Sequence, residues 1–164
     1  MGKYIYEIIR DTEGDMWVGG LADLVRCQTN HHTAQRYNNQ PVRALCQLGE
    51  DTMVVACTYC TFLIDKNTGK RRYICDTYTQ DVEVVGKNIW MATNGRGLLR
   101  FNTETRRIDT LDIRHGLLSN FVNSILYADS SLWLGTENGL CRYKIEQGKE
   151  KIYSYQFTPE LAGV

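Results

Sequence analysis

Hydrophobic and polar residues alternate along most of the chain in short runs, which polar or glycine-containing turns separate. Such alternation is typical of β-strands, because successive side chains point to opposite faces of a sheet. Four runs share one signature, a bulky apolar residue followed two positions later by glycine or alanine. They are Met16-Trp17-Val18-Gly19-Gly20, Met53-Val54-Val55-Ala56-Cys57, Ile89-Trp90-Met91-Ala92-Thr93 and Leu132-Trp133-Leu134-Gly135-Thr136. The chain therefore contains an internal repeat.

The spacing of the repeat predicts a β-propeller. Equivalent positions 17, 54, 90 and 133 lie 37, 36 and 43 residues apart, which is close to the length of a four-stranded propeller blade. We predict an all-β fold with four four-stranded antiparallel blades at residues 4–37, 42–74, 82–111 and 122–155, and a tail or the start of a next repeat at 156–164. Propellers close with about four to eight blades, and no strand is visibly exchanged between the first and last repeats to lock a ring, so we expect an open arc or part of a larger propeller.

The signature itself suggests how blades pack. The small residue two places after the tryptophan leaves room beside the large ring, so that the adjacent blade can approach closely. We expect Trp17, Trp90 and Trp133 to be buried at equivalent positions, with Val54 in their place in the second repeat. In an open arc, the apolar surfaces beside Trp17 and Trp133 are expected to be exposed.

Charge and composition exclude several classes of partner. Lys plus Arg and Asp plus Glu both number 19 in 164 residues, and no block of like charge occurs. A nucleic-acid footprint or a polybasic membrane patch is therefore not expected. No apolar run is long enough to cross a bilayer, and the first residues lack the apolar core of a secretory signal. We expect no membrane contact by this segment and no signal peptide in this chain.

Cysteines and histidines give little indication of metal chemistry. Of six cysteines, only Cys57 and Cys60 have a metal-type spacing, and the three histidines offer no obvious partner set. A tetrahedral zinc site needs more ligands than this. We predict no metal site and no cofactor, with the cysteines acting as small apolar residues.

Three segments resemble a known family. Residues 89–101, residues 132–143 and the linking phrase His115-Gly116-Leu117-Leu118-Ser119-Asn120 are similar to the two-component regulator propeller repeat. In that family the repeats form the extracytoplasmic sensor half of hybrid two-component system histidine kinases, best known from Bacteroides-type bacteria that sense glycan fragments. The resemblance implies a periplasmic location. Family members also carry more repeats, an Ig-like module, a membrane helix and an output domain, so we expect a piece of a larger sensor or a shortened relative.

Connectivity predicts where a ligand binds. Strand direction alternates within a blade, so the loops after the second and fourth strands meet at one edge of the disc, and functional residues are frequent on such loops. Six residues there are able to hydrogen-bond to a sugar or stack on it: Arg96, Asn94, Glu137, Asn138, Tyr59 and His115. Asn138 is also an ordinary turn residue beside glycine, which is the simpler interpretation. The predicted partners are an oligosaccharide and either the remaining blades of a larger propeller or a second copy of the chain.

Three functions compete on these residues. The first is a non-enzymatic sensor segment of a two-component signalling protein that recognises glycan-derived ligands, and it is our prediction. The second is a propeller lyase or hydrolase, since similar repeats occur in antibiotic-cleaving propeller lyases. That chemistry needs a general base and usually a metal, whereas one histidine alone is expected on the loop-rich edge. The third is a protein-interaction scaffold, because the fold does not fix the function.

Overall fold

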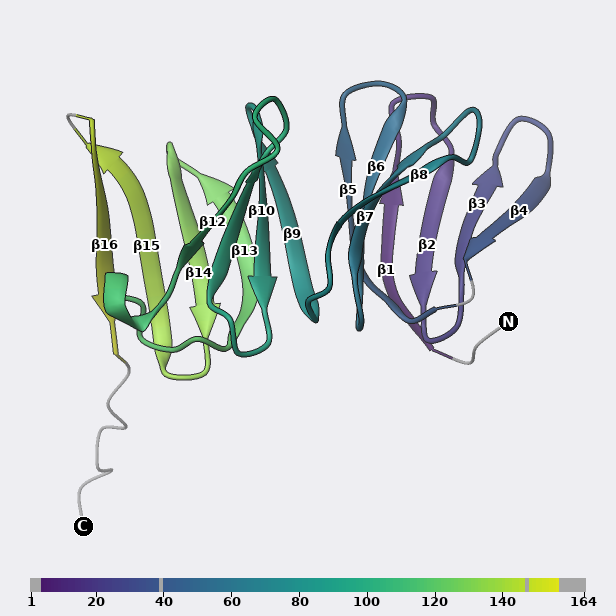
Figure 1. The fold of residues 1–164 in the computed structure, drawn as a ribbon. Helices are drawn as coiled ribbons and strands as arrows, with labels where there is room; N and C mark the ends of the chain where they lie inside the picture. The colour runs from purple at the N-terminus through teal and green to yellow at the C-terminus, as the bar shows by residue number, and fades with distance from the viewer. Residues whose placement is uncertain (1–3, 39, 147, 157–164) are drawn as a thin grey trace, which may run out of the picture.

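The structure is a computed structural model and describes residues 4–38, 40–146 and 148–156. Within these ranges the chain forms sixteen strands and one 3-10 turn, η1 (Ile113–His115). The strands form four antiparallel sheets of four, and each sheet consists of strands that are consecutive in the sequence (Figure 1). This architecture confirms the predicted all-β fold with four blades.

The strands have the following bounds. Blade 1 contains β1 (Ile5–Arg10), β2 (Met16–Gly20), β3 (Leu24–Gln28) and β4 (Thr33–Asn38). Blade 2 contains β5 (Val42–Leu48), β6 (Thr52–Cys57), β7 (Thr61–Asp65) and β8 (Arg71–Cys75). Blade 3 contains β9 (Thr79–Val85), β10 (Asn88–Thr93), β11 (Leu98–Asn102) and β12 (Ile108–Leu111). Blade 4 contains β13 (Val122–Ala128), β14 (Ser131–Thr136), β15 (Gly139–Glu146) and β16 (Lys149–Tyr155).

The four blades stand in a row and form an open arc. Their first strands, β1, β5, β9 and β13, pack successively against one another, and blades 1 and 4 lie at opposite ends of the row (Figure 1). The sheets of the described residues do not close into a ring, as the sequence predicted. Of the predicted tail at 156–164, only Gln156 belongs to the described residues.

A hydrophobic core fills each of the three gaps between blades. Trp17 packs with Met53 and other side chains of blade 2. Val54 packs in the same way with Met91 of blade 3, and Trp90 packs with Leu134 of blade 4. Because residues two apart share a face of a strand, each blade turns its tryptophan face toward the following blade and its other face toward the preceding one.

The tryptophans occupy equivalent positions, but their burial differs. Trp17 is fully buried and Trp90 is 4% exposed, whereas Trp133 is only partly buried because no blade follows blade 4 in the described residues. The prediction that all three are buried is therefore wrong for Trp133. The predicted exposure beside Trp17 is also wrong, because blade 2 covers that face and blade 1 exposes the opposite one.

An arginine from the next strand lies over each tryptophan ring. Arg26 lies over Trp17 with its guanidinium carbon 5.6 Å from the ring centroid. Arg100 and Arg142 take the same place over Trp90 and Trp133, at 5.4 and 5.5 Å. A guanidinium over an indole face is attracted by the ring quadrupole. In each pair the guanidinium group of the arginine is thus packed on the indole ring of the tryptophan.

The glycine of the first signature allows close approach between blades. A Cβ atom at Gly19 would lie 2.6 Å from Val42 Cγ1 of blade 2, far inside van der Waals contact. Ala56 and Ala92 hold the equivalent positions in the next two blades and are fully buried. The structure thus supports the predicted role of the small residue.

Candidate functional site

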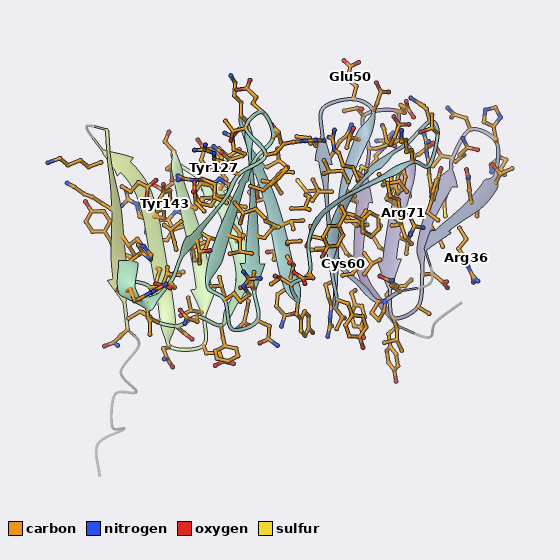
Figure 2. All side chains as sticks on the ribbon, in the orientation of Figure 1. Arg36, Glu50, Cys60, Arg71, Tyr127 and Tyr143 are labelled. Atoms are coloured by element: carbon orange, nitrogen blue, oxygen red, sulfur yellow. The ribbon has the colours of Figure 1, made fainter. Side chains whose placement is uncertain are left out.

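The loops at one edge of the arc are the candidate functional site. The connections β2–β3, β6–β7, β10–β11 and β14–β15 and the links between blades gather along the lower edge in Figure 1, and we call this the loop-rich edge. The hairpin turns lie at the opposite edge, where Figure 2 shows Glu50 of the β5–β6 turn. All six residues selected from the sequence lie in the connections of the loop-rich edge: Tyr59, Asn94, Arg96, His115, Glu137 and Asn138.

Three exposed residues come together where blades 3 and 4 meet. Asn94 forms an isolated β-bridge with Phe121, and the Glu137 N–H donates to the Phe121 carbonyl at 3.1 Å. Gly97 N–H donates to the Asn120 carbonyl at 2.7 Å, which fixes the linking segment against the β10–β11 loop. Asn94, Phe121 and Glu137, which we call the Phe121 cluster, are therefore held by backbone contacts from three segments.

The side chains of this cluster are available to a ligand. Phe121 is 41% exposed, and Asn94 and Glu137 are exposed as well. Neither polar side chain forms a hydrogen bond with a residue that the structure describes. An aromatic face next to a few polar groups is the usual composition of a small-molecule site. Phe121 was not among the residues selected from the sequence, although an aromatic residue directly after Ser119-Asn120 was an available signal.

Two of the predicted residues hold the loops in place. The Asn138 Nδ2 donates to the Leu118 carbonyl at 3.2 Å. The Arg96 Nη1 donates to the hydroxyl of buried Thr77 at 2.7 Å. These bonds connect neighbouring loops, and the bond of Asn138 agrees with the simpler interpretation of that residue as a turn residue.

The structure does not bring His115 and Tyr59 into the Phe121 cluster. His115 ends η1, where its Nδ1 lies 2.9 Å from Asp112 Oδ1. The neighbouring Gly116 carbonyl accepts a hydrogen bond from Ser154 of β16 at 3.2 Å, and Figure 1 shows η1 beside this outermost strand. Tyr59 belongs to blade 2 and is 69% exposed. His115 and Tyr59 therefore lie on the loop-rich edge but outside the Phe121 cluster.

The described surface has pockets at both edges. A shallow pocket of about 470 Å³ lies against the β14–β15 loop and is lined by residues 135–140, including Glu137 and Asn138. It shares Glu137 with the Phe121 cluster. Another pocket, of about 410 Å³, lies near the hairpin turns and has Lys70, Arg72 and Arg106 in its lining, so it is away from the candidate site.

Among the described residues, one group has the composition of a metal site. Ligand atoms of Asp11, Glu13 and Asp15 lie within 4.8 Å of one another. However, Arg26 Nε is 2.9 Å from Asp15 Oδ2, and Lys66 Nζ is 3.3 Å from Asp11 Oδ2. Two protein cations already pair with this group, so it fits an ion-pair network of the β1–β2 turn better than a metal centre.

The cysteines form no disulfide or metal-type cluster within the described residues. Cys57 N–H donates to the Cys60 carbonyl at 2.8 Å, so the pair closes the β6–β7 turn. No disulfide joins cysteines of the described residues. No helix in the described part of the chain has the length and apolarity needed to cross a membrane.

Comparison with known proteins adds structural relatives. No protein-family model matches the sequence, and no curated protein sequence matches it. The extracellular domain of a Bacteroides thetaiotaomicron protein described as a hybrid two-component system has a TM-score of 0.81 at 18% identity, over 100% of this chain and 23% of that chain. A second such domain from this organism has a TM-score of 0.76 at 18% identity, over 98% of this chain and 24% of that chain.

A third similar structure has a different description. An auxiliary nutrient binding protein from Bacteroides thetaiotaomicron has a TM-score of 0.72 at 9% identity, over 92% of this chain and 41% of that chain. The chain spans about a quarter of the length of the two-component domains. These likenesses concern the fold. The chain therefore has the propeller fold of the extracellular domains of Bacteroides hybrid two-component system proteins, as the repeat resemblance predicted.

Proposed function

We propose that this chain is a non-enzymatic ligand-recognition segment of an extracytoplasmic, two-component signalling propeller, and that its ligands are glycan-derived. The observation that carries the proposal is the Phe121 cluster, in which backbone contacts join exposed Phe121 to Asn94 and Glu137, and the side chains of Asn94 and Glu137 have no hydrogen-bond partners among the described residues. The likeness to extracellular domains of hybrid two-component proteins supports the signalling context.

The chemistry of the cluster suits a saccharide. A sugar ring has an apolar C–H face and a periphery of hydroxyl groups. The C–H face packs on an aromatic ring, and the hydroxyl groups exchange hydrogen bonds with amides and carboxylates. Phe121 offers the face, while Asn94 and Glu137 offer a donor and acceptors beside it. Tyr59 provides another exposed ring on the same edge, which suits an extended chain of sugars.

The arrangement of the candidate acid–base groups supports binding as the proposed role. A general base or acid works within hydrogen-bond reach of the proton that it moves. His115 contacts Asp112 and precedes Gly116, which is bonded to β16, whereas Glu137 belongs to the β14–β15 loop. A propeller lyase or hydrolase would bring such groups together.

The end faces of the arc indicate the partner that completes the assembly. Leu126, Tyr153 and Tyr155 of blade 4 are 60, 38 and 41% exposed. They surround Trp133 on the face that blades 1 to 3 turn toward a following blade. We infer that the remaining blades of a larger propeller, or a second copy of the chain, cover this face. A ligand that binds one arrangement of these blades better than another would shift the equilibrium between them.

A glycan screen tests the proposed function. Thermal-shift measurements on the full chain with a library of oligosaccharides should identify a stabilising class, and calorimetry should then give its affinity. Phe121→Ala should weaken binding at least about tenfold, in the range of losses seen for aromatic anchors, whereas Tyr73→Ala on the exposed outer strand β8 should not. The saccharide should be recovered intact. Stabilisation by no saccharide, or cleavage of the ligand, would contradict the proposal.

A further inference from the structure

Each first strand of a blade carries one extra residue at the same place. In all four blades the pairing between the first and second strands shifts register once, opposite the end of the signature strand. The unpaired residues are Tyr6 in β1, Arg43 in β5, Gln80 in β9 and Asn123 in β13. We call them the bulge residues. All four residues are of types whose side chains carry hydrogen-bonding groups.

The bulges lie at the loop-rich edge, where the direction of a side chain affects ligand binding. A bulge is not needed for strand pairing, and bulges are frequent next to binding sites because they re-aim a side chain. The signature strands end at the loop-rich edge, so the bulges lie at that edge too. Since the first strands pack successively along the inner side of the arc, the bulge residues form a row at the mouth of its axis.

Arg43 is the best-defined member of the row. Its guanidinium carbon lies 4.5 Å from the centroid of the Tyr6 ring and 5.3 Å from that of Tyr78. Its Nη2 donates to the Tyr78 hydroxyl. These three residues, which we call the Arg43 cage, come from blade 1, blade 2 and the link into blade 3. Contact with both aromatic rings limits the orientations of the guanidinium group, so its N–H donors are held in a fixed direction.

Arg43 forms no ion pair with a residue that the structure describes. Among the described residues, no carboxylate lies within ion-pair distance of it, and its buried Nε donates to none of them. The inner carboxylates of Glu7 and Asp81 are not paired with it. Burial raises the pKa of both, and the charge of Asp81 raises that of Glu7 further. A buried donor without an acceptor is unfavourable, so an acceptor that reached this guanidinium would be favoured there.

We propose that the Arg43 cage binds the anionic group of an acidic saccharide, either the carboxylate of a uronic acid or a sulfate ester. A guanidinium pairs with both through two parallel hydrogen bonds. Gln80 and Asn123, next in the row, then receive the hydroxyls of the adjoining sugar. This inference rests on the proposed function, because it names the class of glycan that the loop-rich edge recognises.

Calorimetry on the full chain tests the proposal with three probes of equal length: a galacturonic acid trisaccharide, a sulfated galactose trisaccharide and a neutral galactose trisaccharide. Wild type should bind at least one acidic probe about tenfold or more tightly than the neutral one, and the stronger of the two acidic probes identifies the anion. Arg43→Gln should remove this preference, and Arg43→Lys should keep part of it. Arg72→Gln, at an exposed arginine of β8, should leave it unchanged.

A second measurement applies if Arg43→Gln does not fold. The affinity of wild type for the acidic probe should fall as salt is added, while the affinity for the neutral probe stays constant. Equal affinity for acidic and neutral probes, or an unchanged preference in folded Arg43→Gln, would overturn the inference and leave glycan recognition standing. Binding of none of the probes, together with a negative library screen, would overturn both.

Discussion

The ammonium group of Lys66 lies 3.3 Å from the Asp11 carboxylate, and both side chains are fully buried. Lys66 belongs to the β7–β8 turn of blade 2 and Asp11 to the β1–β2 turn of blade 1. The Trp17 Nε1 donates to the same carboxylate at 2.9 Å, and the Lys66 carbonyl accepts from Arg26 Nη1 at 3.1 Å. Lys66 of blade 2 thus pairs with a buried carboxylate of blade 1, and this contact couples the first two blades.

Removal of the Lys66 charge should destabilise the fold strongly. Lys66→Met leaves Asp11 buried without its partner, and breaking a buried ion pair in this way costs about 3–5 kcal/mol. Denaturant unfolding followed by tryptophan fluorescence measures the loss. Lys70→Met, at an exposed lysine of the same turn, should change the free energy of unfolding by no more than about 0.5 kcal/mol. Equal effects of the two variants would refute the coupling.

Two carboxylates should give pH dependences of opposite sign. Burial alone would raise the pKa of Asp11, but hydrogen bonds from Trp17, the Asp15 N–H and Lys66 outweigh it and lower the pKa. Ionised Asp11 therefore stabilises the fold above the unfolded-state pKa of about 4, and this contribution is lost as pH falls through the lower folded value. For Glu7, burial and the Asp81 charge raise the pKa, so its ionised form destabilises the fold at neutral pH.

Thermal unfolding of two variants between acidic and neutral pH tests these signs. Asp11→Asn should lower the melting temperature at neutral pH, and the difference from wild type should shrink as the solution becomes acidic. Glu7→Gln should raise the melting temperature at neutral pH, and this gain should vanish near pH 4, about the unfolded-state value, where the wild-type side chain is protonated as well. Differences that do not vary with pH would show that the carboxylate charges are not responsible.

Overpacking at the first signature glycine should disturb the contact between blades 1 and 2. Gly19→Leu places atoms where Val42 of blade 2 already lies, and overpacked cores typically lose about 1–3 kcal/mol. The matched variant Gly135→Leu is at the same signature position of blade 4, where Ser124 of the same blade is the near neighbour and the described residues include no following blade. Denaturant unfolding should show a smaller loss for Gly135→Leu. The reverse order would contradict the assigned direction of blade packing.

The exposed end faces should make the chain associate. Leu126 on blade 4 and Ile8 on blade 1 are 60 and 53% exposed, and each lies on a face that a neighbouring blade covers elsewhere in the arc. Sedimentation velocity over a concentration series should show association, which the double variant Leu126→Lys and Ile8→Lys should reduce. Leu21→Lys, at an exposed leucine of the β2–β3 loop, serves as the control. A monomer at every concentration would contradict this expectation.

The sequence predicted the blades well because their determinants are local. Strand alternation, polar turns and the signature spacing recur within each repeat, so even the second blade, with Val54 in the tryptophan position, was recognised. The direction of packing was not predictable in this way. Alternation shows that Trp133 and Gly135 share a face, but not whether the following or the preceding blade covers that face.

The candidate site was predictable only in part. Connectivity placed Asn94 and Glu137 on one edge, since antiparallel strands fix where their loops lie. The position of Phe121 between them depends on backbone bonds to loops distant in the sequence. Arg43 was missed because its bulge follows from the pairing register with β6, and its contact with Tyr6 crosses a blade boundary.

The central claim is that the loop-rich edge binds a glycan without transforming it, and amide chemical-shift mapping tests this most directly. Titration of the isotope-labelled chain with the saccharide found in the screen should shift the signals of Asn94, Phe121 and Glu137. The signals of Asn67 and Thr103, in the hairpin turns at the opposite edge, should stay in place, and the saccharide spectrum should show no new product. Shifts confined to the hairpin turns, or the appearance of a cleaved saccharide, would contradict the account.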